Sequence, residues 1–131
     1  MEIDKLAFIS IKDKKILSSR TRGRSVWYIP GGKRESGEND IEALEREIKE
    51  ELSISLLLPS LRYLGVFRAQ ADSHRSGVIV KMTCYSGEFE GEPAPASEIE
   101  EVMYLSYDDK GKCSLVDQLI FDALYASGDI H

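Results

Sequence analysis

Three carboxylates lie within little more than one turn of a segment with helical periodicity: Glu47, Glu50 and Glu51. Residues four apart are neighbours on a helix surface, so Glu47 and Glu51 repel each other at a cost of about 0.2–0.5 kcal/mol. A divalent cation between them would remove this repulsion, and Mg²⁺ and Mn²⁺ both accept hard carboxylate oxygens. The alternative interpretation is a solvated acidic face. Gly31 and Gly32, one loop away, favour the metal site because glycines let a backbone approach a ligand closely.

A helix over residues 41–52 must position these carboxylates. Its apolar side chains recur at spacings of three and four residues, which is typical of one buried helix face; they are Ile41, Leu44, Ile48 and Leu52. The carboxylates fall on the other side, toward solvent or a cleft. Asn39 or Asp40 is the expected N-cap, and the helix is expected to pack against a sheet.

The sheet is predicted from short runs of β-forming residues separated by turn residues. The predicted strands, in chain order, are residues 5–11, 16–19, 25–29, 55–58, 62–67, 78–86 and 102–105. The first two are expected to form a hairpin, and residues 78–86 a central strand. The third is expected to break at Gly31 and Gly32, which follow a proline.

Outside these strands, residues 114–125 carry apolar side chains at helical spacing after Ser114, a good capping residue. This C-terminal helix is expected to pack on the sheet and to have no catalytic role. The polar segments 69–77 and 87–97 are expected to be loops, and His74 in the first of them is expected to be solvated.

Two charged segments flank the predicted centre of the site. The first holds three arginines around a glycine: Arg20, Arg22 and Arg24. Arginine guanidinium groups match the oxygens of a phosphate, so this segment is predicted to bind substrate phosphates, with a solvated loop as the alternative. The second holds Glu98, Glu100 and Glu101. These residues could supply a further metal ligand or a general base, or could simply form a charged entry to a strand.

Composition limits the classes of function. At 131 residues the chain is long enough for one domain with its own core. Its net charge of −6 argues against binding a nucleic acid polymer, which needs a basic face. Two isolated cysteines and two histidines make a zinc site or a disulfide framework improbable. The chain has no apolar run of membrane-spanning length and does not begin with a signal-peptide pattern, so the cytoplasm is the expected location.

A longer pattern includes the carboxylates: Gly32, five residues, Glu38, seven residues, and then the segment Arg-Glu-Ile-Lys-Glu-Glu-Leu-Ser-Ile over residues 46–54. This pattern resembles the Nudix box, and eight of its nine defined positions match at the right spacing. The exception is Ser53, where the family has glycine. A serine in the left-handed conformation that ends a helix costs on the order of 1 kcal/mol. Because this affects helix termination rather than metal binding, activity is expected to survive.

The resemblance covers essentially the whole chain and implies a MutT-like, single-domain Nudix hydrolase over residues 1–131. The implied fold is α/β: an α/β/α sandwich with a mixed β-sheet between the box helix and the C-terminal helix. The family cuts a pyrophosphate bond in a nucleoside diphosphate linked to another group, with Mg²⁺ or Mn²⁺ as cofactor. The implied partner is therefore a small nucleotide-like diphosphate, with no membrane and no nucleic acid polymer; a monomer and a homodimer are both compatible with the sequence.

Residue roles follow from the same resemblance. Glu47 and Glu51 would be metal ligands, with Glu50 as a further or water-mediated ligand and the Gly31 carbonyl as a main-chain ligand. Arg46 would hold a box carboxylate in position. Glu38 and Gly32 would shape the loop, and Gly32 would also contact substrate.

The general base and the substrate stay open at this level. The base could be a box glutamate or a member of the 98–101 segment, and Glu50 and Glu98 are the favoured candidates. A (deoxy)nucleoside triphosphate suits so short a chain. Asn39 is the only asparagine, so an asparagine reader of the base is absent, although Asp117 could take that role. The competing hypothesis is a Nudix-fold module that binds without catalysis, but such modules usually lose box glutamates.

Overall fold

Strand β1 (Glu2–Ile9) lies inside the main sheet of the computed structural model, which describes residues 1–71 and 77–131. It pairs in parallel with β8 (Ile79–Ser86) and antiparallel with β5 (Gly31–Lys33). Strand β7 (Arg62–Gln70) adds to the far side of β8, which gives the order β5-β1-β8-β7. The prediction of a mixed sheet with residues 78–86 as an interior strand is confirmed.

A second, antiparallel sheet runs in the order β10-β3-β2 and consists of Ile99–Leu105, Lys15–Thr21 and Ile11–Lys12. Strand β4 (Trp27–Tyr28) pairs with β3. The remaining short elements are β6 (Ser55–Leu56), β9 (Phe89–Glu90) and two 3₁₀ turns at Leu58–Ser60 and Tyr107–Lys112.

Three sequence predictions of local structure were confirmed only in part. The predicted hairpin with residues 16–19 exists, but only β2 forms it with β3; the rest of the predicted strand 5–11 belongs to β1, which joins the other sheet. The strand predicted over residues 25–29 ends before the glycines, as expected, but Gly31 and Gly32 then open the edge strand β5. The loop over 87–97 contains β9, which pairs with β6. The differences come from pairings between residues distant in sequence, namely β1 with β8, β1 with β5 and β6 with β9.

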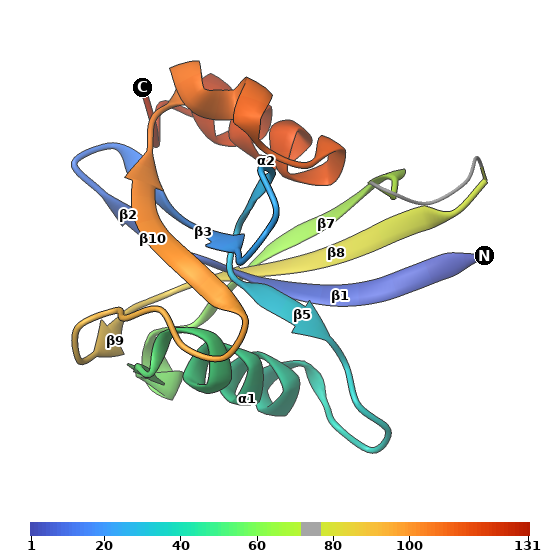
Figure 1. Ribbon diagram of the computed structural model, residues 1–131, viewed down its shortest axis with the longest axis vertical. Coiled ribbons are helices and arrows are strands. Elements are labelled where there is room, and N and C mark those ends of the chain that lie inside the picture. Colours follow the sequence, from blue (N-terminus) through green and yellow to red (C-terminus); the bar gives the residue numbers. More distant parts are fainter. Residues whose placement is uncertain (72–76) are drawn as a thin grey trace.

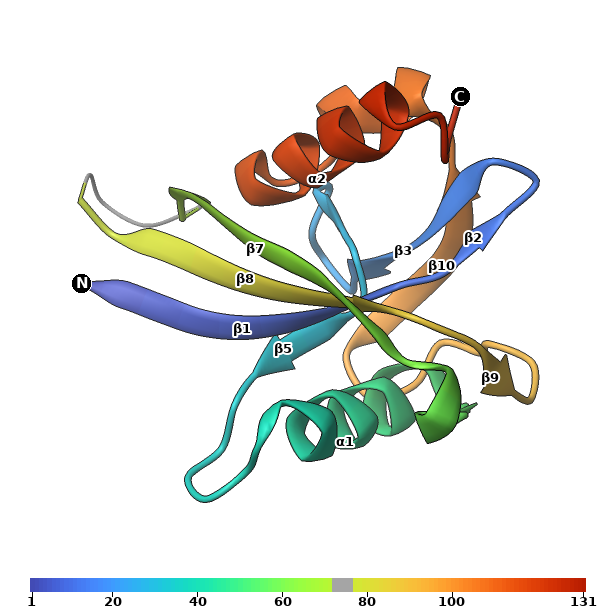
Figure 2. The same ribbon diagram turned by 180° about the vertical axis from the view of Figure 1, so that it is seen from behind.

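Helices α1 (Asp40–Leu52) and α2 (Leu115–Ala126) cover opposite faces of the strands (Figures 1 and 2). One hydrophobic cluster joins Leu44 and Ile48 of α1 to Leu6 of β1. The other joins α2, for example Ile120, to Ala7 on the opposite face of β1. Residues 6–9 are therefore buried on both faces of the sheet, which explains their continuous apolar sequence. The predicted α/β/α arrangement is confirmed.

The helix ends match their local sequence. Asn39 caps α1 in a capping box with Glu42, with bonds of 2.9 and 3.0 Å. Ser53 ends α1 in the left-handed conformation, at φ 58° and ψ 29°. Ser114 caps α2. No helix in the described ranges is both long and apolar enough to span a bilayer. His74 lies outside the described residues.

Candidate active site

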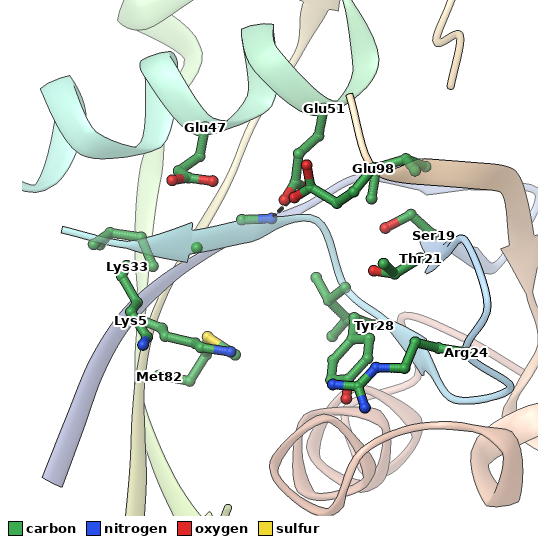
Figure 3. A pocket seen from close by; sticks show the side chains of 15 residues that line it. Lys5, Ser19, Thr21, Arg24, Tyr28, Lys33, Glu47, Glu51, Met82 and Glu98 are labelled. Carbon is green, nitrogen blue, oxygen red and sulfur yellow. Dashed lines mark hydrogen bonds between the residues drawn. The ribbon is translucent and has the colours of Figure 1, made fainter. Parts of the chain in front are cut away.

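A pocket of about 410 Å³ opens where the edge strand β5 meets the C-terminal half of α1 and the start of β10 (Figure 3). Three carboxylates line it: Glu47 and Glu51 from α1, and Glu98 from the segment before β10. Gly31 and Gly32 form part of the same wall. The pocket therefore brings together two box glutamates, the glycine turn and one member of the later acidic segment.

Glu51 is the most deeply placed of these carboxylates. Its Oε1 accepts a hydrogen bond from the Gly31 backbone N–H at 3.3 Å. Burial raises its pKa to about 8; the negative charges of Glu47 and Glu98 add to this effect, and the Gly31 bond opposes it. A carboxylate in such surroundings is stabilised by any cation that enters the pocket.

Glu47 packs directly against Gly32. A Cβ atom at position 32 would lie 2.3 Å from Glu47 Oε2, closer than any side chain allows. Glu47 Oε1 accepts a hydrogen bond from Arg46 Nη1 at 2.8 Å. Burial raises the pKa of Glu47, and the Arg46 bond opposes that shift. Gly32 is thus required by the position of a carboxylate and not by its own backbone angles.

Arg46 is the central cation of the box loop. It binds Glu38 through two bonds of 2.6 and 2.9 Å and reaches the Lys33 carbonyl at 3.0 Å. The Arg46 hydrogen bond is the main cause that lowers the pKa of Glu38 to about 2. Arg46 therefore joins the loop after β5 to Glu47 of α1.

Glu50 and Glu98, the two candidate bases, are placed differently. The Glu50 side chain is 55% exposed, lies outside the pocket, and contacts Arg46 at 3.4 Å. Glu98 lines the pocket, and its backbone carbonyl accepts a hydrogen bond from the Arg22 N–H at 2.8 Å. The hydrogen bond from the Ser97 hydroxyl lowers the pKa of the Glu98 carboxyl. Of the two, only Glu98 is positioned to meet a molecule in the pocket.

The three arginines of the 20–24 segment separate in the structure. Arg20 forms ion pairs with Glu100, at 3.1 Å, and with Glu101, and donates to the Arg24 carbonyl at 2.7 Å. Arg20 thereby joins β3 to β10 instead of facing the pocket. Arg22 is exposed outside the pocket, and only Arg24 lines it.

Several lining residues were not expected from the sequence. They include Lys5, Ser19, Thr21, Tyr28 and Met82, all on strands (Figure 3). The ammonium group of Lys5 lies 5.9 Å from the centroid of the Tyr28 ring. These residues line the pocket because of the register between strands, which no sequence motif reveals. Lys5 alone gave a weak signal, as a charge at the start of an apolar run.

Asp117 does not line the pocket. It is fully buried on α2, and its carboxylate accepts a hydrogen bond from the Ile29 backbone N–H at 2.8 Å. It therefore fixes the strand that leads into the glycine turn.

The NUDIX domain model matches residues 6–118, which is most of the chain. This chain belongs to the Nudix family. The resemblance drawn from residues 32–54 is confirmed, and the pocket described above is the place where the Nudix box meets the rest of the fold.

Individual Nudix proteins show how far the likeness extends. The Nudix hydrolase YvcI of Bacillus subtilis is 28% identical over 97 residues, which are 74% of this chain and 61% of YvcI. The human 8-oxo-dGDP phosphatase NUDT18 is 41% identical over 49 residues, which are 36% of this chain and 15% of that protein. The chain thus spans less than two thirds of the length of either relative.

Solved structures agree with this fold over nearly the whole chain. The E. coli ORF135 protein has 26% identity and a TM-score of 0.75, covering 95% of this chain and 89% of its own. A NUDIX hydrolase from Nitrosomonas europaea has a TM-score of 0.77 at 20% identity, and the match covers 100% of this chain and 93% of that one. At that lower identity the likeness concerns the fold alone.

Proposed function

We propose that this chain is a divalent-cation-dependent pyrophosphohydrolase that cuts a diphosphate bond in a nucleoside diphosphate linked to another group. The observation that carries the proposal is the meeting of Glu47, Glu51 and Glu98 in one pocket beside Gly31 and Gly32. Glu47 and Glu51 are partly buried, and like charges brought together in this way are costly without a cation. We also propose that residues 1–131 act as one Nudix unit.

The donors fit Mg²⁺ or Mn²⁺. In the described ranges no group of three or more His, Cys, Asp or Glu residues could hold a metal by itself. This suits Mg²⁺, which usually keeps several waters and binds one or two carboxylates together with substrate phosphates. Glu47, Glu51 and the Gly31 carbonyl would hold the ion, with Glu50 acting through water. When bound, the ion supplies charge neutralisation at the phosphoryl oxygens and a bound water of lowered pKa.

The other residues of the site have separable roles in this proposal. Arg46 holds Glu47 against Gly32, as its bond of 2.8 Å supports. Glu98 accepts a proton from the attacking water, because of the two candidate bases it is the one that lines the pocket. Arg24 approaches the substrate phosphates from the opposite wall. Arg20 positions the Arg24 backbone and has no direct contact with substrate.

A small nucleotide is the proposed substrate class. A pocket of about 410 Å³ lies in the ordinary range for small-molecule sites. The likeness to NUDT18, named as an 8-oxo-dGDP phosphatase, makes oxidised deoxyguanosine di- and triphosphates natural members of the test set.

The test is a phosphate-release screen with Mg²⁺ and Mn²⁺. It would cover nucleoside triphosphates, oxidised deoxynucleotides, ADP-ribose and dinucleoside polyphosphates. We expect turnover of at least one compound, lost in Glu51→Gln and retained in Glu45→Gln, a matched change at an exposed position on the same helix.

Calorimetry with Mg²⁺ separates the alternatives. If wild type binds the cation but turns over no compound, the enzymatic proposal fails and a nucleotide-binding module replaces it. If cation binding persists unchanged in the double variant Glu47→Gln/Glu51→Gln, the assignment of the metal ligands is wrong.

A further inference from the structure

Lys5 and Lys33 face each other directly across the edge of the main sheet. They are Cα partners in the antiparallel pairing of β1 with β5. Side chains at opposed positions of such a pair project to the same face of the sheet. Both lysines line the pocket that contains the three carboxylates, and Figure 3 shows their side chains side by side near Met82, on the side of β5 away from α1.

This arrangement is electrostatically unfavourable as it stands. Like charges directly opposite each other destabilise a strand pair. Within the described ranges, neither lysine forms an ion pair with a carboxylate. Lys5 is compensated only in part, by the Tyr28 ring 5.9 Å away and by the more distant charge of Glu51. By contrast, Arg34 and Arg46, on the same loop and helix, each contact two or more carboxylates. Lys5 is half-buried, so water screens its charge only in part, whereas Lys33 is exposed.

A second lysine pair in the chain provides an internal comparison. Lys12 and Lys15 are also direct partners, across β2 and β3. Both are exposed and lie outside the pocket, so their ammonium groups have open solvent around them. The two pairs share residue type and pairing geometry but differ in whether a pocket lies in front of them.

We propose that Lys5 and Lys33 form a direct anion-binding pair for the part of the substrate that the carboxylate-bound cation does not neutralise. The pocket then has two poles: Glu47, Glu51 and Glu98 recruit a cation, and the two lysines bind phosphate oxygens without one. This rests on the proposed function and narrows it. The preferred substrates carry a charged phosphate group beyond the bond that is cut, as a nucleoside triphosphate does, in preference to a nucleoside diphosphate joined to a neutral sugar.

Binding of inorganic pyrophosphate in EDTA tests the pair without metal or turnover. We expect wild type to bind, and Lys5→Gln and Lys33→Gln each to lose about tenfold in affinity, the usual effect of one charge-assisted hydrogen bond. Lys5→Arg, which keeps the charge, should retain most of the affinity. Lys12→Gln and Lys15→Gln should bind as wild type does. Circular dichroism would verify that each variant is folded.

Steady-state kinetics add a second measurement. In Lys5→Gln, KM for a nucleoside triphosphate should rise about tenfold, while KM for a nucleoside diphosphate sugar should stay nearly constant. Three results would refute the proposed role of the lysine pair. The first is a failure of wild type to bind pyrophosphate in EDTA, and the second is that Lys5→Gln and Lys33→Gln bind it as tightly as Lys12→Gln and Lys15→Gln do. The third is an equal rise in KM for both substrates in Lys5→Gln. If wild type hydrolyses nothing, the proposed function fails, and the binding measurement still decides the role of the pair.

Discussion

Close approaches between backbone and carboxylate define the site at the scale of single residues. Gly31 has φ 151°, and a Cβ there would lie 2.0 Å from the Leu6 carbonyl oxygen. Gly32 is free of that backbone constraint but lies under the Glu47 carboxylate. The two glycines are therefore needed for different reasons, one for strand pairing and the other for the position of a proposed metal ligand.

Replacing Gly32 with alanine should impair activity more than stability. The added methyl group must displace Glu47, and misplacing a reacting group by about 1 Å can cost on the order of 10²-fold in rate. We expect kcat/KM to fall by about that factor. Gly111→Ala is the control, because nothing lies within 4 Å of a Cβ at that position. Equal activities of the two variants would contradict the role assigned to Gly32.

Glu51 gives a prediction that depends on pH. Its folded pKa of about 8 exceeds the ordinary value of 4.5. Between these values the folded chain retains a proton that the unfolded chain releases, so this residue lowers stability as pH rises through that window. In EDTA, Glu51→Gln should raise the urea midpoint at pH 8 and have little effect at pH 4. Mg²⁺ should stabilise wild type and not Glu51→Gln. If Glu51→Gln is less stable than wild type at pH 8 in EDTA, the raised pKa assigned to Glu51 is wrong.

At the scale of elements, helix α1 positions the carboxylates of the site. Its two caps fix its length, and its buried face fixes its orientation on the sheet. The capping box of Asn39 fixes where the helix begins, and its buried face places Glu47 and Glu51 over the edge of β5. Its C-terminus is where this chain departs from the Nudix pattern. Ser53 adopts the left-handed conformation that glycine adopts without strain, and its N–H still bonds to the Lys49 carbonyl.

Ser53→Gly should therefore stabilise the protein by about 1 kcal/mol, the approximate cost of a left-handed non-glycine residue. Activity should be unchanged, because the carboxylates keep their positions. Urea unfolding measures the gain. The C-cap of α2, Ser127, has φ −83° in the right-handed region, so Ser127→Gly should give no gain. A similar gain at both caps would contradict the explanation from backbone strain.

At the scale of the whole molecule, residues 1–71 and 77–131 form two hydrophobic clusters, one on each side of the strands. Only the cluster under α1 supports the helix that carries the box carboxylates. The cluster under α2 supports the strand before the glycine turn through Asp117 and its bond to Ile29. Both clusters thus stabilise the fold, but only the cluster under α1 supports the acidic pole of the pocket.

A matched pair of core variants separates these effects. Ile48 and Ile120 are both almost completely buried, on α1 and α2 respectively. Replacing either with alanine should cost about 2–5 kcal/mol, measured by urea unfolding. Only Ile48→Ala should also raise the Mg²⁺ concentration needed for half-maximal activity, because it loosens the turn that carries Glu47 and Glu51. Equal metal requirements in the two variants would show that α1 does not set the carboxylate positions through its packing.

Local patterns in the sequence predicted the helices, their caps and the carboxylates of the proposed metal site. Apolar spacing, capping residues and the order of charges in residues 32–54 act over one or two helical turns, so they can be read without knowledge of the fold. The α/β/α class and the Nudix family were accessible for the same reason.

Only the tertiary structure decided which charges share the pocket. Glu98 and Lys5 reach it, whereas Arg20 and Glu101 pair with each other instead. These outcomes depend on the register between strands far apart in sequence, such as β10 with β3 and β1 with β5. A shift of one residue in register turns a side chain to the opposite face, and no local pattern specifies that register.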